Sequence, residues 1–223
     1  TKHLDVETDF GQLSLNGSYS IETLLSSAFN VVKSKLPNLV VLPSTNPTGN
    51  RYDINADITD SEWLTELTGK EIHIDSPLHL TGHVDEGEMQ IDMSCQTPTI
   101  TYNGTRYNDI LIDMSTSNDT IYANLTAEKA SDEEGEKGLE LKLASKACGG
   151  LLYTDINFDN NGGKQHLTGN ISTVTDFMTD SSNRQAAKVS ITPSKIYVNG
   201  TPWDLLESEI SYEKNNLAID GLT

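Results

Sequence analysis

Residues 190–222 hold the pattern that decides the fold of this chain. The segment begins Ser190-Ile-Thr-Pro-Ser-Lys-Ile-Tyr-Val-Asn-Gly-Thr-Pro-Trp-Asp204. Its side chains alternate in polarity over three short runs, and the pairs Asn199-Gly200 and Asn215-Asn216 separate the runs as turns. The apolar members of the runs are Ile196 and Val198, Ile210 and Tyr212, and Leu217 and Ile219. Three short strands joined by turns predict an antiparallel β-meander.

Alternating runs of this kind recur along most of the chain, roughly every ten residues, with polar turns between them. They predict a mainly β fold, built as an elongated antiparallel sheet of meander type. A regular open sheet can bend into a groove that is apolar inside and polar outside. The same alternation also suits a closed β-sandwich, because periodicity does not distinguish a core from a groove.

The composition limits both the core and the partners. Of 223 residues, 35% are hydrophobic and only 6% aromatic, which suits a sheet with one apolar face better than a thick globular core. The 15 Lys and Arg against 33 Asp and Glu give a net charge of -18. This charge disfavours direct binding to nucleic acid or to an anionic lipid surface.

Two helices are expected besides the strands. Apolar residues spaced by three and four predict an amphipathic helix over about 20–36, with Ser20 as its cap and its end before Pro37. A capping-box spacing followed by a glycine predicts a short helix over about 60–68, which carries Trp63.

The Pro and Gly residues between 38 and 50 mark the best internal boundary. They divide the chain into a strand–helix segment with its loop, residues 1–50, and a sheet of repeated hairpins, residues 51–223. We expect both to be portions of a longer protein.

The motif I-x-P-S-x-I-x-x-N-x-x-x-W over 191–203, followed by I-x-Y-x-K-N-N-L-x-I-D-G over 210–221, resembles a segment of the TamB-like proteins of Gram-negative bacteria. These proteins are translocation and assembly modules of the AsmA-like superfamily, and the likeness is to the Bacteroidetes-type members. The resemblance is clearest over residues 190–222. Elsewhere it is limited to the general pattern of the sequence and does not include a sharp motif.

The resemblance implies a β-taco, a long groove with an apolar floor, in the periplasm, within a parent protein anchored in the inner membrane. The implied function is non-enzymatic outer-membrane biogenesis: lipid transport between the two membranes, or assistance to outer-membrane protein assembly and protein secretion. The implied partners are phospholipid acyl chains and an outer-membrane β-barrel protein, without any cofactor. Nucleic acid is not expected as a partner.

The floor of such a groove would come from the apolar members of alternating runs. Met residues among them suit loose contact with chains of varied shape. The candidate floor residues are Tyr52, Ile54, Ile58, Ile72, Ile74, Leu78, Leu80, Met89, Ile91, Met93, Ile110, Ile112 and Met114.

Candidate chemical sites are weak in comparison. His73, His79 and His83 stand among aspartates, but Pro77 and Gly82 interrupt the register that zinc ligands would need. The segment from Asp155 begins like a calcium loop, but Asn160 takes the place of the required glycine. No nucleophile, metalloprotease, P-loop or dinucleotide motif occurs in the sequence, so neither an enzyme nor a metal site is expected.

Two other readings stay open. A secreted or surface β-sandwich module could bind glycan or protein through its loops. A structural spacer within a long envelope protein would need no ligand. The two cysteines, Cys95 and Cys148, could be buried thiols or a disulfide, and the sequence does not decide between these states.

Overall fold

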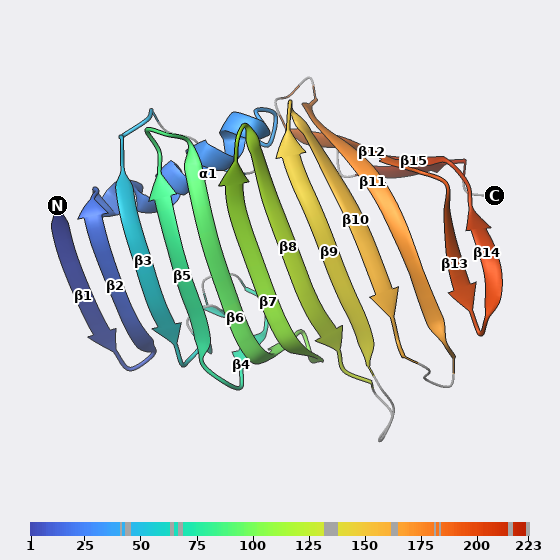
Figure 1. The fold of residues 1–223 in the computed structure, drawn as a ribbon, viewed down its shortest axis with the longest axis horizontal. Helices are drawn as coiled ribbons and strands as arrows, with labels where there is room; N and C mark the ends of the chain where they lie inside the picture. Colours follow the sequence, from blue (N-terminus) through green and yellow to red (C-terminus); the bar gives the residue numbers. More distant parts are fainter. Residues whose placement is uncertain are drawn as a thin grey trace.

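The structure is a computed structural model that describes residues 1–40, 42, 46–62, 65–66, 69–131, 138–161, 165–180, 182, 184–213 and 216–221. Within these residues, sixteen strands form one open antiparallel sheet (Figure 1), so the predicted mainly β fold is confirmed. The strands are β1 (Lys2–Thr8), β2 (Gly11–Ser18), β3 (Arg51–Ile58), β4 (Ile72–Ile74), β5 (Leu78–Asp85), β6 (Gln90–Tyr102), β7 (Thr105–Ser117), β8 (Thr120–Lys129), β9 (Leu139–Cys148), β10 (Leu151–Asp159), β11 (Leu167–Thr179), β12 (Gln185–Ile191), β13 (Ser194–Val198), β14 (Thr201–Leu205), β15 (Ser208–Glu213) and β16 (Asn216–Asp220).

Most strands pair with their neighbours in sequence, as a meander requires. The main path runs β1-β2-β3-β5-β6-β7-β8-β9-β10-β11-β12-β15-β16, while β4 pairs with β6, and β13 joins β11 to β14. At Asn103-Gly104 and Asn199-Gly200, both residues have positive φ, which is the geometry of a type I′ hairpin turn. Because β2 pairs with β1 on one side and with β3 on the other, residues 1–50 and 51–223 contribute to the same sheet.

The predicted long helix is confirmed as a 3₁₀ turn, η1 (Ile21–Thr23), that continues into α1 (Leu24–Lys35). The expectation that the Ser20 side chain caps it is wrong, since Ser20 precedes η1 without a side-chain capping bond. Its backbone N–H instead donates to Asn50 Oδ1 at 3.0 Å. Trp63 and part of the short helix predicted over 60–68 lie outside the described residues.

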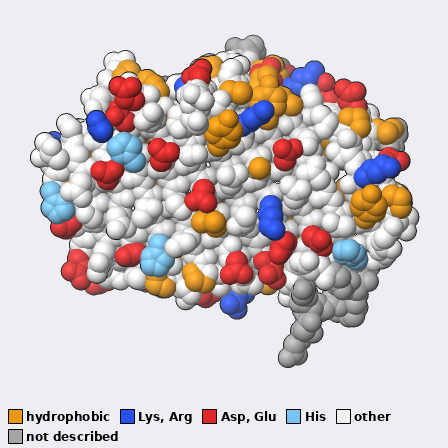
Figure 2. Space-filling view, in the orientation of Figure 1, with side chains coloured by type: hydrophobic (Ala, Val, Ile, Leu, Met, Phe, Trp, Pro, Cys, Tyr) orange, Lys and Arg blue, Asp and Glu red, His pale blue; other side chains and the backbone are white. Residues whose placement is uncertain are grey.

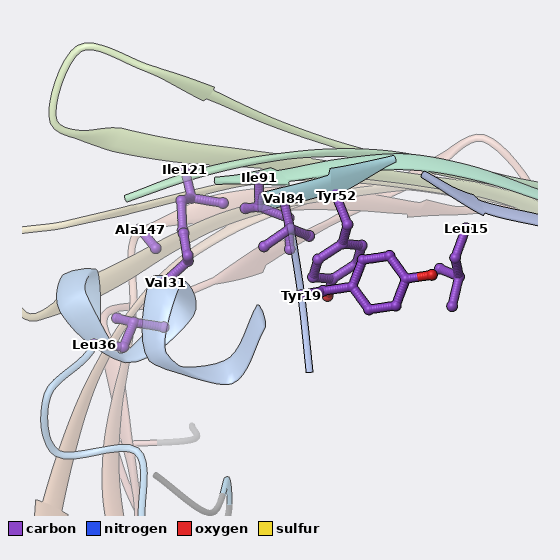
Figure 3. Packing of buried hydrophobic residues seen from close by; sticks show 9 residues of the cluster. All are labelled: Leu15, Tyr19, Val31, Leu36, Tyr52, Val84, Ile91, Ile121 and Ala147. Carbon is purple, nitrogen blue, oxygen red and sulfur yellow. The ribbon is translucent and has the colours of Figure 1, made fainter. Parts of the chain in front are cut away.

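Helix α1 lies across the strands on one face of the sheet, which we call the inner face; the opposite one is the outer face (Figure 1). Val31 of α1 and Leu36, the residue after the helix, pack with side chains that project from the strands (Figure 3). Burial of these side chains removes apolar surface from water and fixes the helix in place. The cluster contains Leu15, Tyr19, Val31, Leu36, Tyr52, Val84, Ile91, Ile121 and Ala147.

The sheet curls toward α1 at its C-terminal end. Strand β12 follows β11 in the sheet, yet its first residue, Gln185, accepts a hydrogen bond from Val40 N–H at 2.8 Å, just beyond the helix. In Figure 1, β12 and β15 accordingly lie behind the plane of the central strands. The described strands therefore form a single curled sheet, and the alternative of two packed sheets is not what the chain adopts.

Candidate functional site

The inner face carries an unbroken row of apolar side chains that crosses ten strands. Each member is the direct cross-strand partner of the next, so all ten project from the same face. We call this set the floor row. From β1 to β11 it consists of Val6, Leu13, Ala56, Leu80, Cys95, Ile112, Leu125, Leu143, Ile156 and Ile171.

The floor row is accessible from the inner side. Val6 and Ile112 are 37% and 38% exposed, and Ala56, at 7%, is the one buried member. Neighbouring strands lie about 4.8 Å apart, so ten strands give a row about 43 Å long. The hydrocarbon core of a bilayer is about 30 Å thick, which allots about 15 Å to the chains of each leaflet. The row is therefore longer than one lipid acyl chain.

A hollow deepens the N-terminal end of this face. Its volume is about 310 Å³, at the low end of the range for small-molecule pockets. The residues that line it are Val6, Thr8, Phe10, Gly11, Gln12, Leu13, Ile54, Ala56, Asp57, Ile58 and Leu80. Apart from a few polar groups at its edge, this wall offers only dispersion contacts to a ligand.

Ten of the thirteen candidate floor residues point to the inner face by strand register. Of these, Tyr52 and Ile91 are buried in the cluster beneath α1, at 5% and 2% exposure, and are not available to a ligand. The other eight are Ile54, Ile58, Leu78, Leu80, Met93, Ile110, Ile112 and Met114.

The three remaining candidates lie elsewhere. Met89 belongs to the turn between β5 and β6 and packs against the helix cluster. Ile72 and Ile74 pair with Tyr102 and Ile100 of β6, which alternate with inner-face residues of that strand. The β4 pair is therefore out of line with the floor row.

Eight of the ten floor-row residues were not among the candidates, which include only Leu80 and Ile112 of this row. Leu125, Leu143, Ile156 and Ile171 alternate in sequence like the candidates do, and Cys95 lies two residues after Met93. The same alternation of apolar and polar residues, followed through the later hairpins, would therefore have identified them. Their alignment across strands depends on the pairing register, which the sequence does not state.

The outer face is polar (Figure 2), with apolar side chains in small separate groups. The histidines that form a cluster in sequence are spread over this sheet, each beside an aspartate. His83 Nδ1 lies 2.7 Å from Asp53 Oδ1, and His79 pairs with Asp57. Among the described residues, three or more His, Cys, Asp or Glu side chains nowhere gather in a geometry that could hold a metal ion.

Polar contacts fasten α1 along one long edge of the sheet, which we call the helix rim. Tyr52 Oη donates to the Leu24 carbonyl at 2.9 Å near the start of the helix. At its end, Lys35 pairs with Asp119 of the β7–β8 turn and its carbonyl accepts from Gly150 N–H at 3.0 Å. Tyr52 lies near the start of β3, and Asp119 and Gly150 lie in turns at the same ends of the strands, so the helix closes this edge of the inner face.

A buried carboxylate joins the helix to the sheet between these points. Glu86, in the β5–β6 turn, is 1% exposed. Its Oε1 accepts from Asn30 Nδ2 at 2.7 Å, and its Oε2 accepts from Thr48 N–H and Thr48 Oγ1, both at 2.8 Å. The N–H of Asn50 adds a fourth bond at 3.2 Å. One side chain thus joins α1, the loop before β3 and the β5–β6 hairpin.

Acid is expected to weaken this attachment. Burial raises the pKa of Glu86, but the hydrogen bonds from Asn30, Thr48 and Asn50 outweigh it, so the net pKa is lowered from the ordinary value of 4.5. A lowered folded-state pKa stabilises the fold above the unfolded value, and this contribution is lost as pH falls through the folded value. Unfolding monitored at a series of pH values should show this loss below 4.5, and Glu86→Gln should remove it.

The two cysteines are free thiols on opposite faces of the sheet. Cys95 belongs to the floor row, and burial raises its pKa. Cys148 follows the inner-face residue Ala147 and pairs with Leu151, which places it on the outer face. The chain therefore carries one native reporter group on each face.

No helix in the described part of the chain is long and apolar enough to span a bilayer. No protein-family model, curated protein or solved structure matches the chain.

Proposed function

We propose that the chain is a non-enzymatic lipid-carrying segment whose inner face holds the acyl chains of phospholipids. The observation that supports this is the floor row, ten apolar side chains in register, of which all but Ala56 are accessible to solvent. Together with the resemblance of residues 190–222, it favours a TamB-like periplasmic protein that serves outer-membrane biogenesis by carrying lipid between the membranes or by aiding assembly of outer-membrane proteins.

The energetics of such binding are apolar and need no reacting group. Each methylene moved from water onto the floor gains at most about 0.8 kcal/mol, which is about fourfold in affinity. The polar headgroup stays in water at the edge of the sheet, where its desolvation costs nothing. Because the floor row continues over neighbouring strands, a bound acyl chain can shift by one strand and keep equivalent contacts. Transport along the sheet requires such shifts.

Protection of the native thiols tests the proposal. Alkylation by N-ethylmaleimide is followed at each cysteine by mass spectrometry, with and without a single-chain phosphocholine lipid below its critical micelle concentration. At lipid ten times above its Kd, alkylation of Cys95 should slow by about tenfold, because a bound chain covers the floor row. Cys148, on the outer face, should react at an unchanged rate.

The comparison of the two cysteines decides the outcome. Slower reaction of both thiols would mean non-specific coating, and unchanged reaction of both would mean that the inner face does not hold a chain. Lengthening the alkyl chain should increase the protection of Cys95 at a fixed lipid concentration. Protection that does not respond to chain length would contradict an apolar floor.

A further inference from the structure

We infer that the inner face selects its amphiphile by headgroup charge, and that it favours uncharged, zwitterionic or cationic headgroups over anionic ones. This inference rests on the proposed function, since it concerns the polar end of the same bound molecule. Its basis is the shape of the site, which leaves one edge for a headgroup, together with the charges at that edge.

The helix rim is closed to a headgroup. Helix α1 packs over the inner-face residues nearest this rim, among them Tyr52, Val84 and Ile121, all at most 5% exposed. The Asn30–Glu86 hydrogen bond and the Lys35–Asp119 ion pair also attach the helix to the β5–β6 and β7–β8 turns. A headgroup on this side would have to displace the helix from its apolar contacts and remove the Asn30 hydrogen bond from the buried carboxylate of Glu86, and both changes are unfavourable.

The opposite edge, which we call the open rim, is formed by the far ends of the same strands. It includes the β1–β2 and β6–β7 turns and the adjacent ends of β10 and β11, and α1 makes its anchoring contacts at the other rim (Figure 1). The hollow lined by Phe10 lies at this rim, next to the β1–β2 turn. An acyl chain on the floor row therefore has its polar end directed to the open rim.

The open rim is predominantly acidic. In its described turns and strand ends, the Lys and Arg residues are Lys70, Arg106 and Lys129, and Lys142, two residues further along β9, pairs with Glu140. The carboxylates there include Asp9, Asp60, Glu71, Glu128, Glu140 and Asp159. The chain as a whole has a net charge of -18, so the local field is not offset elsewhere. An anionic headgroup at this rim meets like charge, whereas a zwitterionic or cationic one does not.

Four dodecyl amphiphiles with different headgroups test this inference, each below its critical micelle concentration: maltoside, phosphocholine, trimethylammonium and sulfate. Binding is measured by calorimetry at low ionic strength and again at high salt. The sulfate should bind about threefold to tenfold more weakly than the maltoside at low salt, and the trimethylammonium more tightly. The differences should shrink at 1 M salt, where the Debye length is about 3 Å.

Charge-neutralising variants locate the effect. Asp9→Asn with Glu71→Gln removes two carboxylates from the open rim and should reduce the difference in affinity between the sulfate and the maltoside. Glu22→Gln with Glu88→Gln removes two carboxylates from the helix rim and should leave this difference in affinity nearly unchanged. All four residues are exposed, so the fold should tolerate each change.

The outcomes separate this inference from the proposed function. If the maltoside does not bind, the proposed function fails and the inference fails with it. If the maltoside binds and the sulfate binds as tightly at low salt, only the headgroup inference is overturned. An equal response of the two double variants would assign the selectivity to net charge and would overturn the role of the open rim.

Discussion

Replacement of Ile112 by glutamate is expected to weaken binding of a long-chain amphiphile at least about tenfold. Ile112 lies in the middle of the floor row, between Cys95 and Leu125, and is 38% exposed. An alkyl chain bound across this position would have to cover a carboxylate or lose its contacts with the floor row over several strands. Either cost exceeds the contribution of one or two methylenes. Calorimetry with a phosphocholine amphiphile measures the change.

Leu111→Glu is the matched control. Leu111 is the preceding residue of β7 and pairs with Gln96 and Thr126 on the outer face. The two variants share the strand, the apolar-to-acidic change and the added charge, and they differ in the face that receives it. Leu111→Glu should bind as the unaltered chain does. Equal losses in both variants, with thermal unfolding unchanged, would remove the inner face as the binding site.

The fold class could be predicted from sequence because it depends on local signals. Alternating polarity predicts the strands, and the Asn199-Gly200 pair predicts the hairpin turn that the structure has at this place. The helix before Pro37 followed from a change of apolar period after Ser20. Each of these signals lies within a few residues of the element that it predicts, so neither tertiary contact nor register was needed to read it.

The arrangement of the candidate site could be predicted only in part, because it depends on pairing between strands. Ile112 and Leu80 were recognised as floor residues, but their connection through Cys95 appears only in the register of β5, β6 and β7. The β7–β8 pairing shifts register between Asn108 and Leu111, and the sequence gives no sign of that irregularity. A shift of one residue moves a side chain to the other face, so such details decide which residues form a floor.

The enclosure of one rim was not predicted, because its contacts join distant segments. Glu86 lies in a turn, yet it accepts a hydrogen bond from Asn30, 56 residues earlier. Gln185 likewise accepts from Val40, across 145 residues. The alternating pattern places Tyr52 and Ile91 on the floor for the same reason, because nothing local in the sequence shows that α1 covers them.

Replacement of Glu86 by alanine is expected to lower the free energy of unfolding by about 3 kcal/mol. The variant leaves the amide of Asn30, the hydroxyl and N–H of Thr48 and the N–H of Asn50 without the acceptor that all of them share. Asn50 is buried and Asn30 is half-buried, so solvent compensates only partly for the loss of their acceptor, whereas the exposed Thr48 can bond to water. Urea unfolding measures the effect, and hydrogen exchange of α1 amides shows whether the helix detaches first.

Glu88→Ala provides the control within the same turn, because Glu88 is exposed and its N–H, not its side chain, makes the contact with Asp85. Its unfolding free energy should change by less than about 0.5 kcal/mol. If the helix detaches in Glu86→Ala while the sheet persists, the apolar residues beneath it become additional floor, and binding of a long-chain amphiphile should increase. A Glu86→Ala protein as stable as Glu88→Ala would show that apolar packing alone holds α1 on the sheet.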